Sequence, residues 1–160
     1  TEIYTLSLHD ALPICMSARH ALQLLENVPG LKWVFDTANP IFNPDRSRPK
    51  PWPKQDPWDF WTQVRDATVH IHIKDATWNP QKNDADYRWP GEGDGRVRDI
   101  VSDALSRGYD GGISIEPHMA VVFHDSSTRA SAQAQYANYI EYGRRLASLV
   151  SEVERELQAA

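Results

Sequence analysis

The sequence contains only one cysteine, Cys15, which excludes an intramolecular disulfide and any zinc site built on several cysteines. It also lacks an excess of basic residues: the net charge is −5, so an extended surface for nucleic acid is not expected. No apolar run approaches the roughly 20 residues that a membrane-spanning helix needs, and no secretory signal is recognisable. These absences predict a cytoplasmic protein and argue against nucleic acid or a membrane as its partner.

Aromatic and apolar residues are plentiful. Apolar residues make up 41% of the 160 residues and include six Trp and six Tyr, enough for one domain with a core. Residues 1–15, TEIYTLSLHDALPIC, fit this domain poorly, because their Leu and Ile spacing is neither helical nor typical of a buried strand. They resemble a translated sequencing-adapter artefact. We therefore interpret residues 1–15 as a non-native tag and residues 16–160 as the domain; the alternative is a native edge strand over residues 3–8.

The hydrophobic pattern predicts alternating helices and strands. Ser17 and Asp56 are placed to cap helices, Pro57 follows at a first helical position, and Gly108 is the glycine expected after a helix end. The expected strands cover residues 31–37, 68–76 and 111–118; the expected helices cover 17–27, 97–105 and 128–157 and a segment that begins at 57; the expected loops cover 38–55, 77–96 and 119–127. The last helix is expected to bury Tyr136, Ile140, Gly143, Leu146, Val150 and Val153.

The connection lengths are asymmetric: each helix-to-strand connection is short, and each strand-to-helix connection is long. Strand–helix repeats predict a parallel sheet with helical crossovers. In a (β/α)₈ barrel the strand-to-helix loops build the active site, which explains the asymmetry. A doubly wound sheet also binds ligands at the carboxyl ends of its strands and remains the second interpretation.

Three candidate metal ligands lie at the ends of the three expected strands: Asp36, His72 and Glu116. They are 36 and 44 residues apart, each about one strand–helix unit of a barrel, of roughly 31 residues, plus an enlarged loop. Neighbouring strands are about 4.8 Å apart, so the three side chains can reach one ion. One imidazole and two carboxylates suit a single divalent ion such as Mn, Mg, Co or Zn. Such an ion stabilises an enediolate when a carbon next to a carbonyl loses its proton, and Glu116 is the candidate base.

The alternation of side chains supports this grouping. In TVHIHIKDA the polar side chains of His70, His72 and Lys74 share one face, and Gly112 shares a face with Glu116. The imidazole of His70 is therefore expected beside a neighbour with almost no side chain. Structural roles remain open for each residue: Asp36 could start a turn, His72 could be a core histidine, and Glu116 could pair with Lys74.

Four segments, VFDTANP, HIHIKDA, PGEGDG and ISIEPH, resemble in this order the C-terminal half of the sugar phosphate isomerase/epimerase family, which has the xylose isomerase-like TIM barrel. The resemblance covers about residue 17 to the C-terminus. It implies a partial (β/α)₈ TIM barrel, about strands 6–8 with their helices. In that family Glu, Asp, His and Glu bind one divalent metal, and the glutamates exchange protons with the sugar. Asp36, His72 and Glu116 match the last three ligands, whereas the first glutamate would precede residue 17.

The chain alone is therefore expected to be a catalytically inactive fragment of an isomerase, an epimerase or a related dehydratase in carbohydrate metabolism. Asn39, His70, Lys74 and His118 are the candidate substrate contacts, although several family members have a His at position 39 and ketose epimerases have an Arg near Trp78. The resemblance also allows a homo-oligomeric parent. The alternatives are a metal-dependent endonuclease of the same superfamily that acts at abasic DNA sites, and a non-catalytic sugar-binding barrel.

Overall fold

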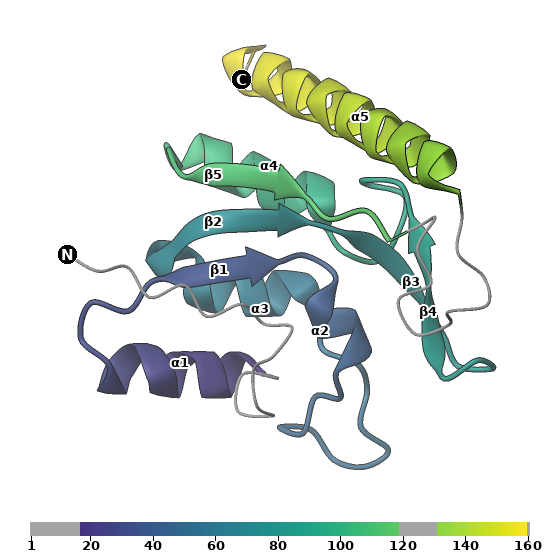
Figure 1. Ribbon diagram of the computed structural model, residues 1–160. Coiled ribbons are helices and arrows are strands. Elements are labelled where there is room, and N and C mark those ends of the chain that lie inside the picture. Colours follow the sequence, from purple (N-terminus) through teal and green to yellow (C-terminus); the bar gives the residue numbers. More distant parts are fainter. Residues whose placement is uncertain (1–16, 119–130, 160) are drawn as a thin grey trace.

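A parallel sheet of three strands forms the centre of the protein. The computed structural model describes residues 17–118 and 131–159. Its strands β1 (Trp33–Asp36), β2 (Thr68–Ile73) and β5 (Gly112–Ile115) lie in the order β1-β2-β5, and both pairings are parallel. Their carboxyl ends therefore point to the same edge, as the arrowheads in Figure 1 show. The predicted strands and helices occur in the predicted order, with further elements between them.

Four helices pack against the apolar face of this sheet: α1 (Ala18–Asn27), α3 (Pro57–Val64), α4 (Val97–Ser106) and α5 (Ala132–Ala159). Alternation along β1 and β2 turns Phe35, Ile71 and Ile73 toward the helices, where all three are fully buried. Apart from Val34, the strand residues on the opposite face are polar or small. The sheet thus separates a hydrophobic core from a polar surface that leads to the strand ends.

The helix ends confirm the predicted capping residues. The Ser17 side chain accepts a hydrogen bond from the His20 N–H at the start of α1. Asp56 accepts from the Trp58 N–H at 2.7 Å, and Pro57 begins α3. Gly108 follows α4 with a φ of +73°, a left-handed conformation that glycine adopts without a steric cost. Local chemistry therefore fixes where these helices begin or end.

Aromatic contacts join α3 to β1 and to α4. The ring of Phe35 meets Trp61 edge to face, with centroids 5.3 Å apart. The Trp61 Nε1–H donates to the Asp103 carboxylate at 2.8 Å, and Arg65 also donates to this carboxylate at 2.9 Å. The polar edge of a buried indole is thereby satisfied, so Trp61 contributes both packing and a hydrogen bond between helices.

The orientation of α5 differs from the prediction. Tyr136 and Ile140 are 70% and 58% exposed rather than buried. The buried side chains of α5 are Tyr142, Leu146, Leu149 and Val153, which recur at helical spacing in the middle of its 28 residues. The N-terminal turns of α5 extend past β5 in Figure 1, so its packing surface starts later than the hydrophobic pattern indicates. No helix in residues 17–118 or 131–159 combines the length and the apolar character needed to cross a bilayer.

Two segments expected to be loops contain secondary structure. The strand expected over residues 68–76 ends at Ile73, and β3 (Asp75–Asn79) then pairs antiparallel with β4 (Asp84–Arg88). This hairpin lies at the carboxyl ends of the parallel strands (Figure 1). The expected loop over 38–55 begins with the short helix α2 (Asn39–Phe42), and a 3-10 turn, η2 (Arg65–Ala67), precedes β2. Residues 1–15 and 119–127, for which a tag and a loop were predicted, fall outside the described residues.

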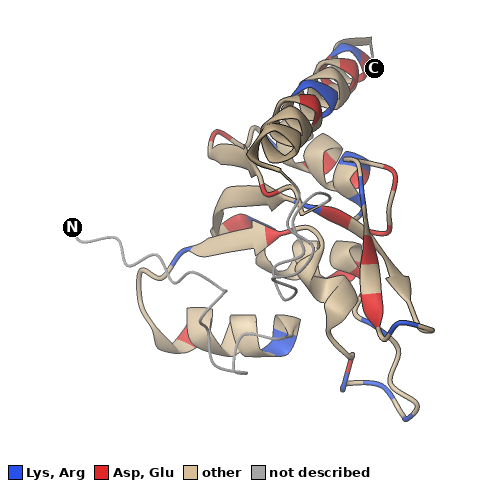
Figure 2. Cartoon of the chain, turned by 45° about the vertical axis from the view of Figure 1, so that its right-hand side comes forward, with Lys and Arg blue, Asp and Glu red and all other residues tan. Residues whose placement is uncertain are grey.

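Charged side chains of both signs are spread over the described surface. Acidic and basic positions follow one another along α5, whereas the segment between α2 and α3 is mostly basic (Figure 2). Within that segment, Arg46 and Lys50 lie over the ring of Trp52 at 5.1 and 4.6 Å. These cations therefore lie against an aromatic surface of their own loop.

Candidate metal centre

The three predicted metal ligands converge at the carboxyl ends of the parallel strands. Asp36 ends β1 and pairs in register with His72 of β2. Glu116 directly follows β5, and its N–H donates to the Ile73 carbonyl at 3.0 Å, which continues the β2–β5 ladder. One ligand atom from each of the three side chains lies within 4.8 Å of the other two. The residues occupy one face because strand alternation places them there.

Asp36 stabilises a local turn and also belongs to the candidate centre. Its side chain is 2% exposed. Oδ1 accepts hydrogen bonds from the N–H groups of Ala38 and Asn39, both at 2.9 Å, and so fixes the turn into α2. Oδ2 lies 2.9 Å from Lys74 Nζ. The turn that the sequence offers as an alternative to ligation thus occupies only one carboxylate oxygen.

Lys74 lies between the two acidic ligands. Its Nζ is 3.4 Å from Glu116 Oε2 and donates to the side-chain oxygen of Asn39 at 2.9 Å, and its side chain is 5% exposed. Burial lowers the pKa of Lys74, but the carboxylates of Asp36 and Glu116 together raise it above its ordinary value. Lys74 therefore carries a positive charge that partly balances the two carboxylates.

His72 and Glu116 form the more accessible side of the centre, with side chains 40% and 22% exposed. His72 Nδ1 lies 3.7 Å from Glu116 Oε2, and His118 Nε2 lies 3.3 Å from Glu116 Oε1. An imidazole exposed to this extent is not a core histidine. The accessible side of the centre is thus the one from which an ion or a substrate can approach.

The donor set fits a divalent cation. Burial raises the pKa of Asp36 and the neighbouring carboxylate of Glu116 adds to this rise, whereas Lys74 opposes it. A second positive charge beside the two carboxylates would favour their ionised forms. Two carboxylate oxygens and one imidazole nitrogen suit Mn, Mg, Co or Zn. The residues present are therefore sufficient for three ligands of one ion.

His70 lies two residues before His72, on the same face of β2. It pairs in register with Gly112, which confirms the prediction that it has a neighbour without a side chain. Its Nε2 shares a hydrogen bond of 2.8 Å with Ser114 Oγ, and its ring meets that of His72 edge to face at 5.2 Å. Burial lowers the pKa of His70, and His72 adds to this effect. His70 thus packs beside His72 rather than at the accessible side of the centre.

Replacing Gly112 by alanine tests this close packing. A Cβ at Gly112 would lie 2.6 Å from His70 Nδ1, so the imidazole or the strand must shift. We expect Gly112→Ala to lower the free energy of unfolding by about 1–3 kcal/mol. The control is Gly143→Ala in α5, where the new Cβ would make an ordinary contact of 3.6 Å with Ile115; it is expected to raise stability by up to about 1 kcal/mol. Urea unfolding measures both, and equal effects would contradict the packing argument.

Two residues near the centre are not among the predicted site residues. Asp75 is 1% exposed, and its carboxylate accepts backbone N–H groups from Gly91, Gly93 and Gly95. Tyr87 of β4 stacks on His118 with ring centroids 4.9 Å apart. The alternating glycines of PGEGDG are the sequence feature that could have indicated the role of Asp75, because their N–H groups donate to it. No local pattern indicates Tyr87, because its position depends on the hairpin.

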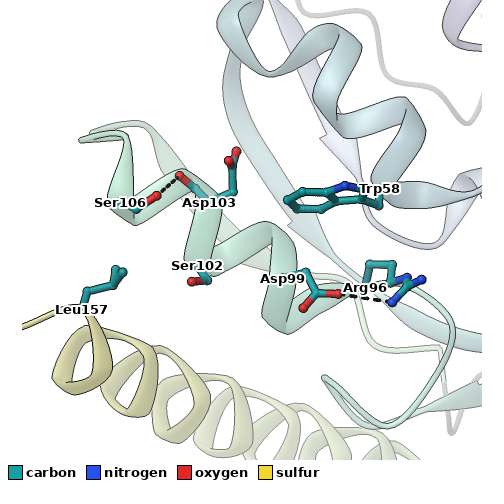
Figure 3. A pocket seen from close by; sticks show the side chains of 7 residues that line it. All are labelled: Trp58, Arg96, Asp99, Ser102, Asp103, Ser106 and Leu157. Carbon is teal, nitrogen blue, oxygen red and sulfur yellow. Dashed lines mark hydrogen bonds and ion pairs between the residues drawn. The ribbon is translucent and has the colours of Figure 1, made fainter. Parts of the chain in front are cut away.

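A separate hollow of about 580 Å³ lies on the helical side of the protein. Figure 3 shows its lining, Trp58, Arg96, Asp99, Ser102, Asp103, Ser106 and Leu157, which comes mainly from α4. None of the three candidate metal ligands contributes to it. Its charged groups pair with protein groups: Arg96 contacts Asp99 at 3.4 Å, and Asp103 accepts from Trp61 and Arg65. The strand ends, rather than this hollow, carry the candidate chemistry.

The comparison with protein families agrees with this geometry. The family model described as "Xylose isomerase-like TIM barrel" matches residues 7–146. The chain belongs to this family. The predicted family and the partial (β/α)₈ barrel are thereby confirmed. No curated protein matches the chain.

Two solved structures are similar to the chain in fold. A xylose isomerase domain protein from Planctomyces limnophilus is 18% identical, with a TM-score of 0.61; the match covers 90% of this chain and 45% of that one. A xylose isomerase-like TIM barrel protein from Mycobacterium smegmatis, solved in complex with magnesium, is 18% identical with a TM-score of 0.51; the match covers 84% and 40%. This chain therefore spans less than half of the length of either barrel.

Proposed function

We propose that this chain is part of a divalent-metal-dependent sugar or sugar phosphate isomerase or epimerase that acts in the cytoplasm. The observation that carries the proposal is the convergence of Asp36, His72 and Glu116 at the ends of three adjacent parallel strands. Membership of the xylose isomerase-like TIM barrel family supports it. Because the chain spans less than half of its structural neighbours, the activity belongs to the whole protein, and this chain supplies three ligands and one acid–base group.

Asp36, His72 and Glu116 would hold the ion. When bound, a divalent ion supplies a Lewis acid that polarises a substrate carbonyl and lowers the free energy of negative charge on its oxygen. The magnesium complex of the Mycobacterium smegmatis protein supports a hard divalent cation such as Mg or Mn as the candidate, beside Co and Zn.

This chain supplies the side chains needed for one proton transfer. Glu116 has an accessible carboxylate and is the candidate base that removes the proton from the carbon next to the carbonyl. Lys74 lies 3.4 Å from this carboxylate, so its positive charge is placed to stabilise an enediolate oxygen. Asn39 keeps Lys74 in place through its 2.9 Å contact, and His118 orients Glu116 from the other side. The second acid–base group would come from the part of the barrel that precedes these strands, so the 160-residue chain alone should be inactive.

The test uses the whole protein and its Glu116→Gln variant at saturating Mn²⁺, with ketoses in deuterium oxide. The wild-type protein should incorporate deuterium at the carbon next to the carbonyl, as measured by NMR. The variant should lose incorporation by about 10²- to 10⁴-fold, because a carboxamide does not accept the proton.

Each of three outcomes would contradict a different part of the proposal. Full deuterium incorporation by Glu116→Gln would remove Glu116 as the base. Cleavage of DNA at abasic sites, with two or three metal ions per chain, would favour the endonuclease; one ion favours the isomerase. Binding of sugars with no exchange in the wild-type protein would favour the non-catalytic barrel.

A further inference from the structure

The β3–β4 hairpin brings an aromatic side chain to the candidate centre from outside the parallel sheet. Tyr87 of β4 pairs in register with Ala76 of β3 near the base of the hairpin. This base adjoins the carboxyl end of β2 (Figure 1). Tyr87 is therefore close to the strand ends although it belongs to a separate two-stranded sheet.

Three rings from three different parts of the chain form a row that ends at Glu116. Phe42 of α2 and Tyr87 have centroids 6.1 Å apart, and Tyr87 and His118 have centroids 4.9 Å apart with planes inclined by 37°. His118 Nε2 lies 3.3 Å from Glu116 Oε1. We name Phe42, Tyr87 and His118 the aromatic wall. It leads from the base of the hairpin to the candidate base.

Packing inside the protein does not cover the aromatic wall completely. Ala76 and Ala85 of the hairpin are buried, whereas Tyr87 and Phe42, which pack against their cluster, are only half-buried. Burial raises the pKa of Tyr87, while Lys74 lowers it and the nearby carboxylates, including Asp36, raise it further. The phenol thus lies within electrostatic range of the centre and retains an exposed part.

An aromatic ring beside a charged centre suits a ligand with both apolar and polar surface. Sugars present carbon–hydrogen groups on one face and hydroxyl groups around the edge, so one face packs on a ring while hydroxyl groups bind polar side chains. We propose that Tyr87 determines substrate specificity: the aromatic wall receives the carbon–hydrogen face of a polyhydroxylated carbonyl compound whose reactive end faces Glu116. This inference rests on the proposed function, because it assumes that the reaction takes place at Glu116.

The test compares the 160-residue chain with its Tyr87→Leu and Tyr87→Phe variants, using Mg²⁺ and D-fructose as probes. In saturation-transfer NMR, irradiation of aromatic protein signals should reach the D-fructose C–H protons in the wild-type chain. Tyr87→Leu should weaken D-fructose binding about tenfold, and Tyr87→Phe should keep it within about twofold, because the ring rather than the hydroxyl makes the contact. The Mg²⁺ affinity should be unchanged in both variants.

Trp78→Leu controls for damage to the hairpin. Trp78 lies in the same hairpin, but its ring is covered by Lys54 Nζ at 3.4 Å, so D-fructose binding should stay at the wild-type level. Wild-type binding by Tyr87→Leu, no saturation transfer to D-fructose in the wild-type chain, or equal weakening of Mg²⁺ and sugar in Tyr87→Leu would overturn the inference.

The same variant in the whole protein separates this inference from the proposed function. If the whole protein exchanges deuterium and Tyr87→Leu leaves KM unchanged, the aromatic wall alone is refuted. If the whole protein exchanges no deuterium but Tyr87→Leu selectively loses D-fructose, the wall is supported and the isomerase function fails.

Discussion

Asp75→Asn is expected to lower the free energy of unfolding by about 3 kcal/mol or more. The Asp75 carboxylate accepts four backbone N–H groups at 2.9–3.0 Å, from Ala76, Gly91, Gly93 and Gly95. In asparagine one of the two oxygens becomes an NH₂ group, so two buried N–H groups would face another donor. Each buried donor without a partner costs about 1–3 kcal/mol. The loss of stability should therefore exceed that of an ordinary surface substitution several-fold.

Two of these glycines, Gly93 and Gly95, allow the loop to approach the Asp75 carboxylate closely. A Cβ at Gly93 would lie 2.4 Å from Asp75 Oδ1 and 2.7 Å from the Ala76 carbonyl oxygen, and one at Gly95 would lie 2.7 Å from Asp75 Oδ1. The loop approaches the carboxylate so closely that a side chain at either glycine would push it away. The Asp75 carboxylate therefore joins the hairpin base to the start of α4, beside the hydrogen bond that the Asp94 N–H donates to the Ala76 carbonyl at 2.8 Å.

Urea unfolding measures this effect, and Asp110→Asn is its control. Asp110 is exposed, so its exchange should change stability by less than about 0.5 kcal/mol. A loss below about 1 kcal/mol in Asp75→Asn would show that the loop finds other hydrogen-bond partners, and the anchor role would be rejected.

His72→Gln should weaken Mn²⁺ binding by about a hundredfold or more. The variant removes the one imidazole of the candidate centre and leaves two carboxylates and the opposing Lys74 charge. Loss of residues that merely support metal ligands costs about 10- to 100-fold in affinity, so loss of a ligand should cost at least as much. Isothermal titration calorimetry at neutral pH measures the affinity. The rise in Tm that Mn²⁺ gives the wild-type chain should shrink accordingly.

His70→Gln is the matched control, because His70 lies two residues earlier on the same strand face. Its Nε2 bonds to Ser114, so its loss should change the Mn²⁺ affinity by less than about threefold. Equal losses in both variants would mean that the strand as a whole was disturbed. An unchanged affinity in His72→Gln would refute the centre.

The sequence by itself determined the helix caps, the parallel order of the strands and the face on which Asp36, His72 and Glu116 lie. These features depend on residues close together in the chain: Ser17 and Asp56 bond to N–H groups two or three residues away, and alternation along a strand has a fixed period of two. Short sequence patterns therefore predict these features. Because side chains alternate along each strand, the alternation also predicts that Asp36, His72 and Glu116 lie on the same face of the sheet.

Only the tertiary structure decided how Lys74, Asp75 and Tyr87 are used. Lys74 contacts Asp36 and Glu116 across two strand pairings, and Asp75 accepts hydrogen bonds from N–H groups 16 to 20 residues ahead. Tyr87 reaches His118 through a hairpin that the sequence indicated as a loop. The same holds for α5, where the position of the sheet edge sets which turns are buried and leaves Tyr136 exposed. Contacts between residues far apart in sequence depend on the packing of whole elements, which no local period encodes.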